Sequence, residues 1–150
     1  MYYLGNKEIL NNYKIGFLCS RKVPAGIILK TYDWAVEQRD KGNCIVSGFH
    51  SKIEKDVFDI LVKGSQPIIL VLAKGMMKRW DKKIIELVNQ NRLLIISLFS
   101  EKVTRPTIKT AIKRNELIAE ISDKIFIPYF SPNSYLQTLY DNYKLKVLTL

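Results

Sequence analysis

The run Ile68-Ile69-Leu70-Val71-Leu72 constrains the fold of this chain more than any other feature. It is an uninterrupted series of aliphatic residues, opened by Pro67 and followed by Ala73-Lys74-Gly75. A strand without a polar face is typical of the centre of a parallel sheet, where helices cover both faces. The rest of the chain must therefore supply neighbouring strands and the helices that connect them.

Strand-like and helix-like patterns alternate along the sequence, with short connections and no linker or repeat. The alternation predicts a single α/β domain over residues 1–150, a Rossmann-like, doubly wound, mostly parallel sheet of about six strands with helices on both faces. Residues 1–13 are interpreted as a lead-in segment, with a turn at Gly5-Asn6 and a helical turn after it. The predicted strands are 14–19, 44–46, 68–72, 93–96, 124–127 and 146–150, and the predicted helices are about 24–41, 51–63, 81–89, 106–120 and a last one that starts at 131–134.

Apolar residues recur at helical spacing within the predicted helices, which predicts one face of each packed against the sheet. Leu29 in the first helix and Ile85 in the third are placed on these faces. Ile108 is placed on or near the packed face of the fourth helix.

The chain is strongly basic, with 24 Lys and Arg residues against 14 Asp and Glu and a formal net charge of +10. Such an excess favours a polyanionic partner, because cations neutralise phosphates and attract them over a distance. We therefore rank a nucleic acid or a nucleotide ahead of the alternative that the basic surface serves only solubility.

Cysteine usage and hydropathy indicate a reducing compartment. Cys19 and Cys44 are interpreted as buried free thiols, since two cysteines form neither a disulfide framework nor a metal-ligand set. The first residues lack the basic and apolar regions of a signal peptide, and no apolar run approaches ~20 residues. We expect a cytoplasmic protein without a membrane partner.

Small hydroxyl residues, glycines and cations recur directly after the predicted strands. Because the carboxyl ends of parallel strands meet at one edge of a sheet, these residues should gather there and suit a phosphate. Each signal is weak alone, since loops are often built of serine and glycine, and His50 could equally be structural. The residues are Ser20 with Arg21, Ser47 and Gly48 with His50, Lys74 with Gly75, Ser97 with Ser100, and Ser131 with Ser134.

Two further basic clusters allow two interpretations each. Arg105, Lys109 and Lys113 follow one another at four-residue intervals, which places them on one helix face beside Arg114-Asn115. They form either a secondary anion-binding face or an ordinary solvated one. Around Trp80, a second cluster could hold phosphates while the ring stacks on a base, or the ring could cap the core. Its cations are Lys74, Lys78, Arg79, Lys82 and Lys83.

Several enzyme classes lack their motifs in this sequence. There is no G-x-G-x-x-G after the first strand, no P-loop and no G-x-S-x-G elbow. His50 is the only histidine, so no histidine cluster can hold a metal. We expect no catalytic residues, no metal and no cofactor.

The order of motifs resembles the DNA-processing protein A family (DprA, also called Smf), within the SLOG group of Rossmann-like domains. Gly5-Asn6 with Ile9-Leu10 is similar to the family's lead-in, Phe17 to Arg21 to its "(V/G)-S-R" turn, and Ile45 to Gly48 to its "vvSG" strand end. Gly64 to Leu72 is similar to "gG-x-T-I-a-V-L". The most specific match is Arg114 to Asp123, which resembles "R-N-R-x-I-a-g-L-S-D".

The resemblance implies an extended Rossmann domain that binds single-stranded DNA at its basic strand ends and helps to load the RecA recombinase during DNA uptake. It implies DNA or anion contacts from Ser20, Arg21, Ser47, Gly48, Arg114 and Asn115. We add His50, Lys52 and Lys74 to these candidates as neighbouring strand-end residues. A homodimer is also anticipated, and no winged-helix domain is expected.

The chain departs from the family in its second motif. The family's "S-G-x-A-x-G-I-D-x-x-A-H" has Lys52 at its second glycine, Glu54 at its Asp and Phe58 at its final His. Three hypotheses follow. The first is a non-enzymatic protein that binds single-stranded DNA in DNA uptake or recombination. The alternatives are a SLOG-type domain that binds a free nucleotide or a nucleotide-derived signal, and a nucleotide hydrolase.

Overall fold

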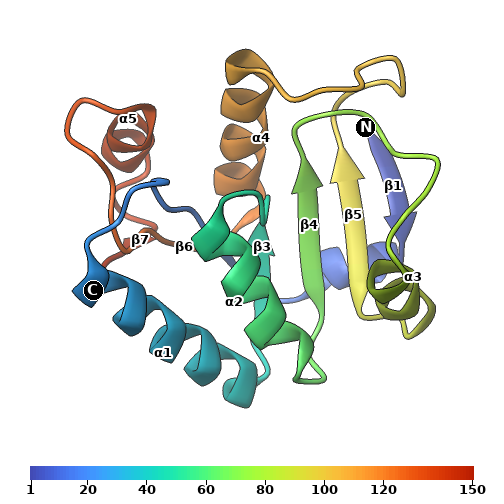
Figure 1. Cartoon of the computed structure of the whole chain (residues 1–150), viewed down its shortest axis with the longest axis horizontal. Helices are drawn as coiled ribbons and strands as arrows, with labels where there is room; N and C mark the ends of the chain where they lie inside the picture. The colour runs from blue at the N-terminus through green and yellow to red at the C-terminus, as the bar shows by residue number, and fades with distance from the viewer.

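A computed structural model describes residues 1–150 and contains one seven-stranded sheet (Figure 1). The strands are β1 (Tyr2–Gly5), β2 (Lys14–Phe17), β3 (Cys44–Ser47), β4 (Ile68–Leu72), β5 (Leu93–Ser97), β6 (Lys124–Phe126) and β7 (Val147–Leu148). Their order across the sheet is β1-β5-β4-β3-β2-β6-β7. Every pair is parallel except β1 with β5, so the predicted mostly parallel α/β sheet is confirmed.

Helices cover both faces of this sheet, as the doubly wound pattern predicts. One face packs Val46 and Val71 against Leu117 and Ile118 of α4, and the other packs Ile45 against Ala35 of α1. Successive strand residues thus enter opposite cores, which is why the central strands are apolar throughout. The helices are a 3-10 turn η1 (Lys7–Asn11), α1 (Ala25–Lys41), α2 (Lys52–Val62), α3 (Lys82–Asn89), α4 (Ile108–Ile121) and α5 (Tyr135–Asn142).

The order in which the chain adds strands to the sheet reverses between β2 and β6: β3, β4 and β5 follow on one side of β2, and β6 and β7 lie on its other side. After β2 the chain enters α1 on one face, whereas after β6 it enters α5, whose Leu139 packs on the opposite face. The two strands are hydrogen-bonded neighbours, with Gly16 opposite Ile125. Loops that leave adjacent parallel strands in opposite directions open a crevice beyond the strand ends, and such crevices bind ligands in α/β proteins.

The amino-terminal segment is the main departure from the predicted elements. Instead of a lead-in alone, Tyr2–Gly5 forms β1, an antiparallel edge strand on β5. Its residues are mostly exposed, so it has no continuous apolar run to identify it. At its end, Gly5 has φ 107, and a Cβ there would collide with the carbonyl of Leu93. The strand is therefore defined by backbone pairing and a glycine turn rather than by hydropathy.

The prediction that three apolar helix residues pack on the sheet is wrong. Leu29 is 66% exposed, Ile85 is 45% exposed and Ile108 is 84% exposed. On α1 the core positions include Thr31 and Gln38, whose polar atoms are satisfied by hydrogen bonds to Ile27 O and from Asn43 Nδ2. Buried polar residues that are hydrogen-bonded can replace apolar ones, and an apolar pattern alone cannot locate them.

None of the helices combines the length and the apolar composition needed to cross a lipid bilayer. The longest, α1, carries charged residues along its length.

Candidate functional site

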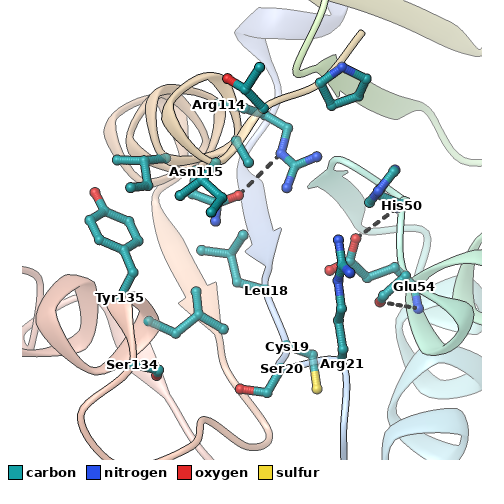
Figure 2. Close-up of a pocket in the computed structure, with 17 residues that line it drawn as sticks. Leu18, Cys19, Ser20, Arg21, His50, Glu54, Arg114, Asn115, Ser134 and Tyr135 are labelled. Atoms are coloured by element: carbon teal, nitrogen blue, oxygen red, sulfur yellow. Dashed lines mark hydrogen bonds between the residues drawn. The ribbon is translucent and has the colours of Figure 1, made fainter.

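A cavity of about 720 Å³ lies at the carboxyl ends of β2 and β3 (Figure 2). Helix α4 contributes lining side chains from its first residue onward. Helices α2 and α5 contribute lining side chains from their first turns. The cavity therefore occupies the crevice that the reversal between β2 and β6 predicts. Its lining comes from four segments of the chain, residues 18–21, 50–54, 106–115 and 134–136.

Arg114 projects from α4 into this cavity and is only 8% exposed. Its Nε donates a hydrogen bond to Asn115 Oδ1 at 3.2 Å, and its other guanidinium N–H groups have no hydrogen-bond partner in the protein. Burial lowers its pKa, but an arginine keeps its charge under these conditions. The protein thus holds a buried cation whose donors remain available for a ligand (Figure 2).

Gly48 makes room for this guanidinium. A Cβ at position 48 would lie 2.8 Å from Arg114 Nε and 2.9 Å from its Cδ and Cζ. Any side chain at Gly48 would therefore displace Arg114. Gly48 therefore does not line the cavity, and its role in the structure is to leave space for the Arg114 side chain.

Arg21 lies across the cavity, in the loop that follows β2. It is exposed and makes no salt bridge or side-chain hydrogen bond, so its fork of donors is unoccupied. Burial lowers the pKa of Arg114 most, the charge of Glu54 raises it, and the charge of Arg21 lowers it further because the two guanidinium groups repel each other. An anion between them would relieve that repulsion.

Glu54 is a buried acid at this site that the sequence reasoning noted only as a departure from the family motif. It is 6% exposed, and its Oε1 accepts the backbone N–H of His50 at 2.8 Å. Burial raises its pKa, while Arg114 and the hydrogen bonds lower it. The spacing Ser51-x-x-Glu54 is the available signal, because a serine cap followed by glutamate is typical of a helix start.

Ser20 ties two strand ends together. Its Oγ accepts a hydrogen bond from Ser131 N at 3.0 Å, and its N–H donates to Tyr129 O at 3.2 Å. These bonds join the end of β2 to the loop between β6 and α5. The hydroxyl hydrogen of Ser20 stays free to donate into the cavity.

One wall of the cavity is apolar, which the sequence reasoning did not predict. Leu18, Ile112 of α4, and Tyr135 and Leu136 of α5 all contribute to the lining of the cavity. The Tyr135 hydroxyl donates to Glu116 Oε1 at 2.8 Å, so the ring is held in place. Burial and this bond raise the pKa of Tyr135. A fixed aromatic ring near two guanidinium groups suits a ligand with a planar apolar part and an anionic part.

Of the other predicted strand-end residues, Ser134 also lines the cavity, whereas Ser47, Lys52 and Lys74 lie outside it. Ser47 is fully buried, and its Oγ accepts a hydrogen bond from Phe49 N at 3.3 Å. Lys52 is exposed and pairs with Asp56 at 2.8 Å. Lys74 lines a separate cavity of about 400 Å³ between the loops after β4 and β5, although its charge still reaches His50. The cavity brings together Ser20, Arg21, His50, Arg114 and Asn115 of the predicted set.

The secondary basic face is smaller than predicted. Because α4 begins at Ile108, Arg105 lies in the preceding loop and does not share a helix face with Lys109 and Lys113. Those two lysines are exposed on α4 and form no salt bridge, but neither lines the cavity. In the cluster before α3, Trp80 is half-buried and packs on the core, as the structural alternative predicts.

Cys19 and Cys44 are buried free thiols, in agreement with the sequence. Cys19 borders the cavity, where burial and the charge of Glu54 raise its pKa to about 12, so the thiol is protonated at neutral pH. No group of three His, Cys, Asp or Glu side chains is placed to hold a metal ion.

Comparison with known proteins identifies relatives of the same fold. The chain matches DNA processing protein A from Helicobacter pylori, a protein with a described single-stranded DNA binding mode, with a TM-score of 0.78 and 21% identity over 99% of this chain and 70% of that one. The DNA processing protein A of Streptococcus pneumoniae gives a TM-score of 0.78 and 18% identity over 98% of this chain and 53% of that one. These identities establish the fold alone.

A more distant likeness, to the Moco carrier protein of Chlamydomonas rheinhardtii, has a TM-score of 0.55 and 14% identity over 93% of this chain and 76% of that one. No curated protein matches the sequence. The family model described as DNA recombination-mediator protein A matches residues 1–134, which is most of the chain. The chain therefore belongs to the DNA recombination-mediator protein A family.

Proposed function

We propose that this protein binds single-stranded DNA in the cavity at the ends of β2 and β3. The observation that carries the proposal is the pair of unoccupied guanidinium groups of Arg21 and Arg114, one of them buried. Forked guanidinium donors match phosphate oxygens, and burial strengthens that interaction. The H. pylori relative, which binds single-stranded DNA, has the same fold over 99% of this chain.

The two halves of the cavity suit the two parts of a nucleotide. Phosphate would lie between Arg21 and Arg114, whose forked donors match its oxygens. A base would lie against Tyr135 and Leu136 on the apolar wall. Bases can leave their stack for such a wall in a single strand, whereas in a duplex they are paired and buried. This arrangement favours single-stranded over double-stranded DNA.

The proposed role is non-enzymatic and belongs to DNA uptake or recombination. The Cys19 thiol, with a pKa of about 12, is a poor nucleophile, and Glu54 is engaged by backbone N–H groups. We further propose that the protein transfers the bound strand to a recombinase. We also propose that it acts as a homodimer in the cytoplasm. Light scattering of the purified protein tests the dimer, and capture of a purified recombinase with and without DNA tests the transfer.

Fluorescence anisotropy with a labelled oligonucleotide at two salt concentrations tests DNA binding. Arg21→Ala should weaken binding about tenfold and reduce the dependence of affinity on salt by about one phosphate contact. Arg79→Ala is the matched control, because it removes the same charge from an exposed arginine outside the cavity. No binding by the wild type at low salt, or equal losses in both variants, would contradict the proposal.

The cavity volume of about 720 Å³ also favours a second candidate, a free nucleotide or nucleotide-derived signal as the ligand. Thermal shift with mononucleotides and with an oligonucleotide separates the two. Equal stabilisation by a mononucleotide would favour the small ligand, whereas stabilisation by the oligonucleotide alone would favour DNA. Formation of a product from any nucleoside phosphate in the same samples would instead identify a hydrolase.

A further inference from the structure

His50 has a free ring on a fixed backbone at the rim of the cavity. Its backbone N–H is held by Glu54 Oε1 at 2.8 Å, and the preceding Phe49 is buried with φ 44, a left-handed conformation that is uncommon for a residue with a side chain. Such backbone strain gathers at functional positions. The imidazole itself has no hydrogen-bond partner, and it lines the cavity with Arg21 and Arg114 (Figure 2).

Four cations from four segments lie close enough for their charge to act on this imidazole. They are Arg114 from α4, Arg21 from the loop after β2, Lys55 from α2 and Lys74 from the loop after β4. Glu54 is the acid packed beside the same loop, and its carboxylate is buried against backbone N–H groups. Burial, followed by these four positive charges, lowers the pKa of His50 below its usual value of 6.5. At neutral pH the ring is therefore uncharged while the cavity is empty.

We propose that His50 is a third phosphate contact of this cavity and that it takes up a proton when the phosphate binds. This inference rests on the proposed function, because it requires DNA phosphate between Arg21 and Arg114. A phosphate placed there offsets the positive charges that repel the imidazolium. It also offers a hydrogen-bond acceptor to the ring, which has no such partner in the protein. The bound strand would gain one more charge-assisted hydrogen bond.

The sign of the pH dependence follows from linkage. If the phosphate raises the pKa of His50, the complex binds a proton that the free protein does not, so affinity increases as pH falls through the pKa of the complex. The increase ends below the pKa of the free protein, where His50 is protonated in both states. The dissociation constant should fall about tenfold for each pH unit that separates the two pKa values.

His50 is the only histidine in the chain, which makes a direct measurement possible. A proton NMR titration of its ring, without and with a thymidine oligonucleotide that lacks terminal phosphates, gives both pKa values without assignment. Neither the phosphodiesters nor the thymine bases of this probe titrate between pH 5 and 8. We expect a pKa below 6.5 in the free protein and a higher one in the complex. Equal values would overturn the inference.

Anisotropy with the same oligonucleotide at constant ionic strength tests the consequence for affinity. The dissociation constant of the wild type should fall between pH 8 and pH 5.5, whereas that of His50→Gln should stay the same at the two pH values. Glu54→Gln is the matched variant, since it removes the neighbouring acid and should retain the tightening. If His50→Gln showed the same increase in affinity at low pH as the wild type, the inference would be overturned and the pH dependence would belong to another group. Absence of DNA binding by the wild type at every pH would overturn the proposed function as well.

Discussion

Two basic regions of this protein differ in what their cations already contact. On the surface of α2 and α3, Lys52 pairs with Asp56 and Lys83 pairs with Asp59, both at 2.8 Å. In the cavity, Arg21 and Arg114 have no acidic partner within salt-bridge distance, although one of them is buried. A solvated pair is already satisfied, whereas an unpaired buried cation costs free energy that an anion can recover. Positive charge alone therefore does not identify the site, whereas an unpaired cation that is also buried in a cavity does.

Arg114→Lys should have the largest effect on DNA affinity. Lysine keeps the charge but loses the planar fork, so the phosphate loses bidentate hydrogen bonds worth about 1.5–3 kcal/mol, roughly a 10- to 150-fold loss of DNA affinity. Anisotropy measures the loss, and circular dichroism confirms that the variant is folded. If the variant folds and binds DNA like the wild type, Arg114 does not contact the strand.

Gly48→Ala should act on the same guanidinium without changing any charge. Its Cβ would displace Arg114, whose Nε would lie 2.8 Å away, so we expect DNA affinity to fall about tenfold and stability to fall by about 1–3 kcal/mol. The matched control is Gly26→Ala on α1, where an added Cβ meets nothing within 4 Å. Urea denaturation and anisotropy on both variants separate the two outcomes. Equal behaviour of the two variants would show that Gly48 does not set the position of Arg114.

The sequence predicts the sheet better than it predicts the site. The central strands were identifiable because they are apolar on both faces, whereas β1 was not, because most of its residues are exposed. Arg21 and Arg114 were identifiable from the motifs that contain them. The contact between Gly48 and Arg114 was not, because it joins β3 to α4 across the fold.

Two polar residues at the site also could not be assigned to it from the sequence. Tyr135 was not singled out by the sequence, and only the folded structure shows that it lines the cavity and bonds to Glu116. Glu54 stood out in the sequence only as a departure from the family motif, yet it is buried under His50. Hydropathy and spacing describe one element at a time, and these contacts form between elements.

Glu54→Gln should change DNA affinity in the opposite direction, by making the cavity more positive. Burial raises the pKa of Glu54 above its unfolded value, so the folded wild type loses stability as pH rises toward the pKa of the folded state. Glutamine removes that pH dependence and can still accept the His50 N–H. We expect DNA binding to tighten a few-fold at any pH at which the wild-type carboxylate is ionised, since one nearby negative charge is lost. Weaker binding at unchanged stability would show that the carboxylate itself helps to position the strand.

Lys83→Ala should give the smallest effect, because it tests the region whose charges are already satisfied. Lys83 is about half exposed and pairs with Asp59 at 2.8 Å, an arrangement worth about 0–1 kcal/mol. We expect DNA affinity to change less than twofold and the salt dependence to stay the same, both by anisotropy. Arg21→Ala removes the same unit of charge and serves as the positive control. A tenfold loss in Lys83→Ala would mean that the surface of α3 binds the strand, and the distinction between paired and unpaired cations would no longer locate the site.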